Sequence, residues 1–402
     1  CFFLLRKESK EKTECFPVDR ISLIYWEELL FFLAFLMWTY LAGFRPAAYG
    51  TEKFMDYGFM EAMMRSTTLP ARDLWYSEGH INYYYGGQYF AVFLTKLSHT
   101  KVELTYNLMR TFVAGLAFAM PFSLVYQMMS DRMKGQQKSE KVIKGLPFAA
   151  GFTAGTAVSI AGNMHYVIYA QIIPLIEKLT GKEVSSYWFP DATRYIGYNP
   201  YREEDRTIHE FPCYSFVLGD LHAHVVNIMF VLLVIALLYV WLRGVRKKTV
   251  PVETSMKDGK FWKEQLLMPH LLVISVLLGM FQWTNFWDFV IYYVVTLGTV
   301  LFANIIRFQG KIKKIMVVTF AQMAEIYLLA YLVILPFTLQ FDTMVDGIGI
   351  AKYHSYFYQL LVLWGLPAVL TITFVISILW EKLQGMEHKS LYRLMKAIRT
   401  AD

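Results

Sequence analysis

Residues 225–242 read VVNIMFVLLVIALLYVWL, and the residues just before them, 209–224, read HEFPCYSFVLGDLHAH. The first stretch is long and apolar enough to cross a bilayer as a helix. The second stretch places three histidines and two carboxylates at the entrance to that helix, at or just below the membrane surface. Ionisable groups at such a depth cost free energy, so we expect this stretch to have a function.

The rest of the chain has the same membrane character. Of its 402 residues, 56% are hydrophobic and only 18% are charged, and several other apolar runs reach about 20 residues. Lysine and arginine give a formal net charge of +7, but they stand in short clusters between the apolar runs. This pattern is typical of a polytopic membrane protein and argues against a nucleic-acid partner. The three widely spaced cysteines predict neither a disulfide framework nor a zinc site.

The predicted fold class is all-α, a polytopic helical membrane protein with about eight spans. The predicted spans cover residues 21–42, 104–129, 146–163, 213–242, 266–283, 289–306, 315–336 and 358–380. Residues 83–98 are too short and polar for a span, and residues 164–180 contain a proline, so we predict two interfacial helices there. Residues 1–402 then form a single transmembrane domain with two long loops on one side, 43–103 and 164–212.

The distribution of basic residues indicates the orientation. With these spans, one side of the membrane carries lysine and arginine at about three times the density of the other. The positive-inside rule makes that side cytoplasmic, so both long loops are expected to be extracytoplasmic. We expect an integral protein of a prokaryotic-type cytoplasmic membrane, with the lipid bilayer as its first partner. Because residue 1 is Cys and no signal-peptide pattern follows, we expect the natural N-terminus to be missing.

Most of the unusual polar and aromatic residues fall on the predicted outer side. The candidate site residues are Glu52, Asp56, Tyr83, Tyr84, Tyr85, Arg206, His209, Glu210, Asp220, His222, His224, Asn285, Trp287 and Asp288. Each type also has a structural explanation. Tyrosines commonly form interfacial belts, Asn285 with Asp288 fits a helix N-cap, and Asp56 alone fits a solvated loop carboxylate.

Two chemistries fit residues 209–224. On a regular helix Asp220 and His224 share a face, and with His209 or Glu210 they could hold a divalent metal such as Zn, Mn or Mg. Alternatively, the imidazoles donate to phosphate oxygens, and Arg206 favours this choice because a guanidinium matches phosphate geometry. A third alternative is a structural polar network. We prefer the phosphate or substrate site and keep the metal as the second choice.

Several short motifs together resemble a known family. They are Glu52 to Tyr57, Ile81 to Tyr85, Arg206 to Pro212, Gly219 to His222, Thr284 to Asp288 and Leu335 to Phe337. In this order they resemble the uncharacterised membrane proteins named for a YYY (triple-tyrosine) domain, which are grouped with the GT-C type of glycosyltransferases. The resemblance covers about residues 20–375. One departure is Ala223, which stands where we expect Pro.

The resemblance implies a GT-C-like enzyme. Such enzymes transfer a sugar from a polyprenyl-phosphate carrier to a glycan, lipid or protein acceptor outside the cytoplasm. An essential Asp in the first outer loop would be Asp56, acting as general base, with Glu52 and Glu210 as further catalytic carboxylates. The histidines and Arg206 would stabilise the leaving phosphate, and the tyrosines and Trp287 would face sugar rings.

Two other functions stay open. A transporter or flippase of a lipid-linked or anionic solute would use Asp220, Glu325 and Arg110 as charges along its path. A non-catalytic membrane subunit would bind a partner through its outer loops. We prefer the enzyme because the charged clusters favour one side of the membrane and no inverted repeat is visible.

Overall fold

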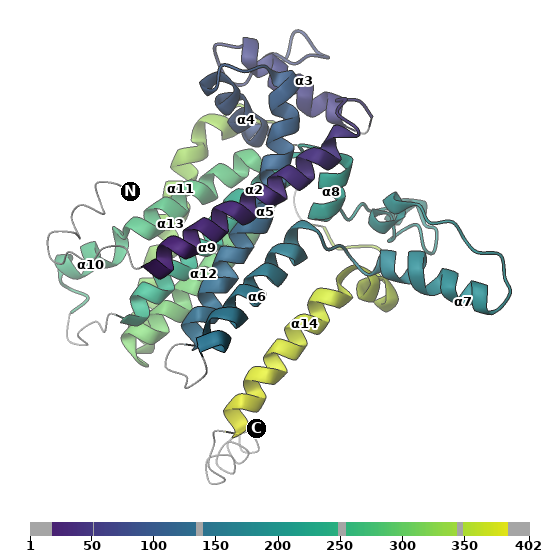
Figure 1. Cartoon of the computed structure of the whole chain (residues 1–402). Coiled ribbons are helices and arrows are strands. Elements are labelled where there is room, and N and C mark those ends of the chain that lie inside the picture. Colours follow the sequence, from purple (N-terminus) through teal and green to yellow (C-terminus); the bar gives the residue numbers. More distant parts are fainter. Residues whose placement is uncertain (1–17, 51, 134–139, 248–254, 344–348, 385–402) are drawn as a thin grey trace. The chain divides into compact units, whose positions relative to one another are not determined.

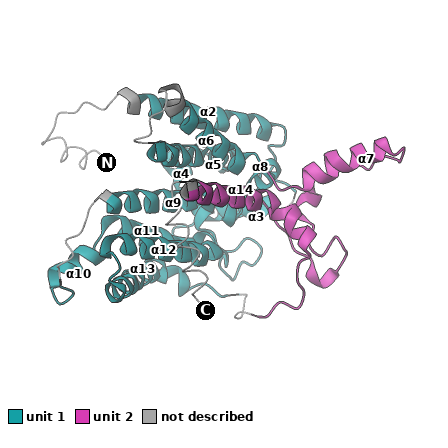
Figure 2. Ribbon diagram, turned by 90° about the horizontal axis from the view of Figure 1, so that it is seen from below, with its two compact units in different colours: residues 1–161, 212–346 teal, residues 162–211, 347–402 magenta. Residues whose placement is uncertain are grey.

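The structure is a computed structural model, and it describes residues 18–50, 52–133, 140–247, 255–343 and 349–384. Within these residues the chain is all-helical, as predicted, apart from two isolated β-bridges. The chain divides into two compact units (Figure 2). The first comprises residues 1–161 and 212–346, and the second residues 162–211 and 347–402. Several of the basic segments on which the predicted orientation depends lie partly outside the described residues.

The first unit is a helical bundle. Its helices are α2 (Val18–Gly43), α3 (Lys53–Arg65), α4 (Gly86–Leu97), α5 (Val102–Met133), α6 (Glu140–Ser159), α8 (Pro212–Leu218), α9 (Ala223–Lys247), α10 (Gly259–Leu266), α11 (Pro269–Thr284), α12 (Phe286–Phe308) and α13 (Ile312–Thr338) (Figure 1). Helix α5 packs against α2, α6 and α9, and α11 packs against α9, α12 and α13. Helix α9 therefore joins two groups of helices, each with its own apolar core.

The second unit is smaller. It contains a π-helical turn (Val167–Ile172) that runs into α7 (Ile173–Leu179), two short 3-10 helices (Phe189–Thr193 and Glu203–Asp205) and α14 (Phe357–Gln384). Residues 164–180 are thus largely helical, as predicted. Pro174 is the second residue after the π-helical turn, inside one continuous helical segment.

Six of the described helices are long and apolar enough to cross a membrane, so this is an integral membrane protein. They are α2, α5, α9, α12, α13 and α14, and α10 with α11 would make a seventh, broken span. The predicted number of eight is therefore not confirmed. Helix α11 has only 16 residues and is bent by 51° from α10. The break precedes Pro269, because the residue before a proline is disfavoured in a helix.

Two glycines one helical turn apart bring α6 close to α5. A Cβ added at Gly151 would lie 2.7 Å from the carbonyl oxygen of Phe122, and one added at Gly155 would lie 2.7 Å from that of Phe118. Small residues at this spacing let membrane helices approach each other closely.

We expect the substitution Gly155→Val to destabilise the protein by about 1–3 kcal/mol, because the added side chain must push α6 away from α5. Gly145→Val in the same helix is the matched control, since a Cβ there meets no atom within 4 Å. Tryptophan fluorescence of the purified protein during thermal unfolding measures both variants. Equal unfolding temperatures for the two would contradict the close contact.

Candidate functional site

The chain turns sharply between α8 and α9, within the predicted span 213–242. Gly219 has a φ of +80°, in the left-handed region, and its N–H donates to the carbonyl of Ser215 at 2.8 Å, which ends α8. Asp220 to His222 are not helical, and α9 begins at Ala223. The predicted regular helix that places Asp220 and His224 on one face is therefore wrong, because the glycine ends the first helix just before them.

Arg110 of α5 holds this turn in place. Its Nη1 donates to the carbonyl of Gly219 at 3.2 Å, and its Nη2 donates to the carbonyls of Ala42 and Arg45, both at 3.3 Å. The hydroxyl of Tyr106, one helical turn earlier, donates to the same Gly219 carbonyl at 3.3 Å. The guanidinium thus ties the turn to the end of α2.

Asp56, in the first turn of α3, faces the α8–α9 turn and is fully buried. Its Oδ1 accepts from the Gln88 side-chain amide at 2.9 Å, and its Oδ2 accepts from the Leu221 N–H at 3.3 Å. The same Gln88 nitrogen donates to the carbonyl of Leu221 at 3.0 Å. Three segments far apart in the sequence, α3, α4 and the α8–α9 turn, therefore meet at one carboxylate.

The Gln88 amide reaches Asp56 and Leu221 because two glycines precede it in α4. A Cβ at Gly87 would lie 2.8 Å from the Cβ of Val226 in α9, and one at Gly86 would lie 2.8 Å from the ring of Trp283 in α11. The start of α4 can press against both helices only without these side chains. Gln88 was not among the predicted site residues, although a lone amide directly after a Gly-Gly pair in an otherwise apolar helix was a usable signal for a site residue.

His222 connects the buried carboxylate to solvent. Its Nε2 forms a hydrogen bond with Oε2 of Glu52 at 2.7 Å, and its Nδ1 lies 3.6 Å from Oδ2 of Asp56. The exposed fraction of the side chain rises from 0% at Asp56 to 12% at His222 and 65% at Glu52. Glu52 and Asp56 are one helical turn apart, which explains how both reach one imidazole. We call this group the Glu52–His222–Asp56 triad.

Burial and charge shift the pKa values of the triad. Burial raises the pKa of Asp56 to about 6, although the charge of His222 and the Gln88 hydrogen bond oppose it. Burial lowers the pKa of His222, but the charge of Asp56, the hydrogen bond with Glu52 and the charge of Asp220 outweigh it, so this pKa is raised.

Both shifts have the same consequence for stability. A pKa raised by folding adds stability at low pH that is lost as the pH rises through the folded-state value. For Asp56, ionisation between its unfolded pKa of 3.8 and its folded pKa of about 6 therefore removes roughly 3 kcal/mol. A fold that keeps a carboxylate in so costly a place is typical of a functional site.

Two more charged side chains are buried beside the triad. Asp220 is 2% exposed and Lys53, which follows Glu52 directly, is 7% exposed. Burial and the charge of Arg110 lower the pKa of Lys53, while the charge of Asp220 opposes them. The positive Lys53 and Arg110 thus balance the acidic groups at this end of the bundle. The sequence reading did not place Lys53 in the site.

The three predicted tyrosines have different surroundings. Tyr85 is 4% exposed and packs edge-on against the rings of Trp283 and Phe337, so it is part of the core. Tyr83 and Tyr84 are half-buried, and Tyr83 packs against Phe59 in α3. The triplet thus fixes the start of α4 through Tyr85, and only its first two members have partly open faces.

Asn285, Trp287 and Asp288 lie at the start of α12. Oδ2 of Asp288 accepts from the side-chain amides of Asn285 at 2.9 Å and of Asn227 at 2.6 Å. Asn285 does occupy the N-cap position, but its side chain caps no backbone N–H. The network joins α12 to α9, whereas Trp287 is 62% exposed.

Arg206, His209 and Glu210 belong to the second unit, so the triad forms without them. The Arg206 guanidinium donates to the hydroxyl of Tyr201 and lies 3.7 Å from the carboxylate of Glu203. Nε2 of His209 forms a hydrogen bond with the Thr207 hydroxyl at 2.7 Å, and burial lowers the pKa of His209. Glu210 is exposed.

The arrangement of ligand groups does not support the predicted metal site. Among the described residues, no three or more His, Cys, Asp or Glu side chains are arranged to hold a metal ion. Asp220 precedes α9 and is buried, whereas His224 lies in its first turn and is exposed. The ring centres of His224 and His222 are 5.9 Å apart.

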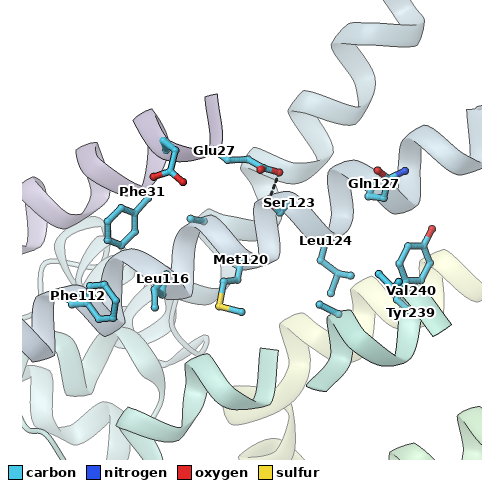
Figure 3. Close-up of a pocket in the computed structure, with 13 residues that line it drawn as sticks. Glu27, Phe31, Phe112, Leu116, Met120, Ser123, Leu124, Gln127, Tyr239 and Val240 are labelled. Carbon is cyan, nitrogen blue, oxygen red and sulfur yellow. Dashed lines mark hydrogen bonds between the residues drawn. The ribbon is translucent and has the colours of Figure 1, made fainter. Parts of the chain in front are cut away.

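Two cavities lie along the helices of the first unit. One of about 320 Å³ is almost wholly apolar and lies between α2, α4 and α5, where Ala91 lines it. Ala91 follows Gln88 by about one turn of α4. The other, of about 500 Å³, lies between α2, α5 and α9, and there Glu27 accepts a hydrogen bond from Ser123 (Figure 3).

The chain is similar to a known protein family. The model of a family described as "Uncharacterized membrane protein (DUF2298)" matches residues 1–401. No curated protein and no solved structure shows significant similarity to the chain.

Proposed function

The chain belongs to this family of uncharacterized membrane proteins, and we propose that it is a GT-C-type membrane glycosyltransferase. The donor in the proposed reaction is a sugar on a polyprenyl phosphate, and the acceptor is a hydroxyl of a glycan, lipid or protein on the extracytoplasmic side. The observation that carries the proposal is the Glu52–His222–Asp56 triad, a chain of acid–base groups at one end of a membrane bundle.

The exposure of the three groups assigns their roles. Asp56 has no exposed surface, so it cannot meet an acceptor hydroxyl directly and acts through His222. Nδ1 of His222 is buried and faces Asp56, so Nε2 is the nitrogen that acts as the general base. Glu52 orients the ring in the free enzyme, the acceptor hydroxyl displaces this exposed carboxylate from Nε2, and Asp56 stabilises the imidazolium that forms. This is the logic of catalytic triads, in which a buried carboxylate holds a histidine in its working orientation.

The proposed chemistry is a single displacement. His222 takes the proton of the acceptor hydroxyl while the oxygen forms a bond to the anomeric carbon. The bond from that carbon to the phosphate oxygen breaks, and the lipid phosphate leaves with the electron pair. One displacement inverts the configuration at the anomeric carbon. No step runs through a metal ion.

The surroundings of the triad support a lipid-linked donor. The apolar cavity of about 320 Å³, which Ala91 lines about one turn of α4 after Gln88, suits part of a hydrocarbon chain and lies between helices of which α2 and α5 are candidate spans. His224 is exposed beside His222, where its imidazole can donate to the leaving phosphate.

The pH dependence of turnover tests the proposal. Because the pKa of His222 is raised above its usual value and burial raises the pKa of Asp56 to about 6, we expect kcat/KM to fall as the pH drops. The fall is about tenfold per pH unit once His222 is protonated and steeper below about pH 6, where Asp56 is protonated as well. Protonation of Asp56 removes the charge that holds the imidazole, and protonation of His222 removes the base. Release of polyprenyl phosphate from synthetic lipid-linked sugars, measured between about pH 4.5 and 8, gives the profile. A flat profile would remove this triad from the reaction.

One observation favours transport as a second candidate. Glu325 lies in α13, a candidate span, and its Oε2 is buried without a hydrogen-bond partner among the described residues. Arg110, by contrast, donates to three backbone carbonyls and so has a structural role. Uptake of lipid-linked or anionic solutes into proteoliposomes that is lost in Glu325→Gln would favour transport.

A further inference from the structure

A polar hollow in the first unit contains none of the side chains used in the reaction proposed above. It has a volume of about 500 Å³ and lies between the last turn of α3 and the loop that follows it. It contains no residue of the triad. Its polar lining residues are Arg65, Ser66, Thr67, Thr68, Arg72, Asp73 and His80.

An isolated antiparallel β-bridge between Arg72 and His80 shapes one wall of this hollow. The bridge is closed by hydrogen bonds from the Asp73 N–H to the Gly79 carbonyl at 3.1 Å and from the Ile81 N–H to the Ala71 carbonyl at 2.9 Å. These bonds flank the bridged residues, so Arg72 and His80 form a non-hydrogen-bonded pair, the kind whose side chains lie closest. The guanidinium and the imidazole therefore project side by side from one face of the loop.

The acidic groups near the hollow already have partners. Oδ1 of Asp73 accepts from the backbone N–H groups of Trp75 at 2.7 Å and Tyr76 at 2.9 Å. Glu61 pairs with Arg65 at 3.5 Å across one turn of α3. Among the described residues, Arg72 and His80 form no ion pair and no side-chain hydrogen bond. Their donors are therefore available to a ligand.

We propose that this hollow binds the oxyanion of a hydroxylated, sugar-like molecule. The guanidinium of Arg72 can hold a carboxylate or a phosphate through two parallel hydrogen bonds, and the His80 imidazole adds a donor beside it. Thr67 and Thr68 offer hydroxyl groups that suit the hydroxyls of a sugar ring, whereas the Ser66 hydroxyl already donates to the Thr68 carbonyl. The volume falls within the range of small-molecule sites.

Helix α3 connects this hollow with the triad. Asp56 stands in its first turn and Arg65 is its last residue, so the two ends are separated by roughly 14 Å along the helix axis. As far as it concerns catalysis, the inference rests on the proposed function: the hollow then holds an anionic group on the acceptor while another part of that molecule reaches His222. Binding itself needs no turnover.

Direct binding to the purified full chain in detergent tests the inference. The probes are glucuronate for a carboxylate, glucose 1-phosphate for a phosphate, and neutral glucose as the control, all at one ionic strength. We expect one or both charged sugars to raise the thermal unfolding temperature in a saturable way, and glucose to have no effect. Comparison of the two charged probes identifies the oxyanion.

Substitutions test whether the charged sugars bind in this hollow. Arg72→Gln should weaken it about tenfold, because the two charge-assisted hydrogen bonds are lost. Lys101→Gln, which removes an exposed positive charge at the start of α5, should leave it unchanged. Arg72 is exposed, so its variant should unfold at the wild-type temperature when no ligand is present.

Several outcomes would overturn the inference: no binding of either charged sugar, equal binding of glucose, or wild-type affinity in Arg72→Gln. Asp56→Asn should bind the probe as wild type does, because Asp56 lies at the other end of α3. Binding without any sugar transfer would therefore refute the proposed function and leave the hollow as an anion site.

Discussion

Replacement of Asp56 by Asn is expected to lower the release of polyprenyl phosphate from a lipid-linked sugar by about 10²- to 10⁴-fold. The amide keeps the size of the carboxylate but has no charge to stabilise the imidazolium of His222, from which Oδ2 is 3.6 Å away. The amide also cannot accept with both atoms, as the carboxylate does from Gln88 and the Leu221 N–H. Steady-state turnover of wild type and variant at neutral pH measures the loss.

The stability of the same variant separates catalysis from folding. Ionised Asp56 costs the fold free energy because its pKa is raised to about 6, so the neutral amide should unfold at the same or a higher temperature at pH 7. Glu103→Gln, an exposed carboxylate at the start of α5, is the matched control and should change neither property. If Asp56→Asn turned over at the wild-type rate, the buried carboxylate would have no part in the reaction.

The substitution Gly219→Ala should prevent the α8–α9 turn from forming. A Cβ there would lie 1.6 Å from Nη1 of Arg110, so the guanidinium would have to leave the three carbonyls that it contacts. The φ of +80° adds backbone strain. Together these effects should cost about 3 kcal/mol or more and should also remove activity, because His222 follows the turn directly.

The substitution Gly310→Ala measures the free-energy cost of backbone strain alone, without a steric clash. Gly310 also has a φ of +80°, but a Cβ there meets no atom within 4 Å. We expect this variant to lose only about 1 kcal/mol and to keep its activity. The unfolding temperatures and gel-filtration profiles of Gly219→Ala and Gly310→Ala in detergent measure the difference between them. If both alanines cost the same, the contact between Arg110 and the turn would carry no special weight.

The length and polarity of the apolar runs were enough to predict most of the helices. The runs 21–42, 289–306 and 315–336 fall inside α2, α12 and α13, because in a membrane every backbone group of a span must be bonded within its own helix. The prediction failed where a local feature interrupts a run. Gly219 ends α8 inside one predicted span, and Pro269 follows the bend between α10 and α11.

Sequence reasoning could also select part of the site. Asp220 and His222 were candidates because ionisable groups beside an apolar run are costly, whereas Glu52 and Asp56 were candidates as a polar cluster in the first outer loop and through the family resemblance. The structure brings these residues together. It did not select Gln88, although the amide directly after a Gly-Gly pair was a usable signal. It could not select the structural role of Arg110, which no local pattern distinguishes from an ordinary polar residue on a helix.

The sequence by itself determined that this chain is an all-helical membrane protein with costly ionisable groups at the start of α9. Only the tertiary structure decided which of those groups meet. Glu52 and His222 are 170 residues apart, Asp56 and Leu221 are 165 apart, and Arg110 and Gly219 are 109 apart. Hydrophobic periodicity and capping signals extend over a few helical turns, so they specify the helices. The pairing across those distances depends on helix packing, which places the buried Asp56 behind His222 and leaves Glu52 in solvent.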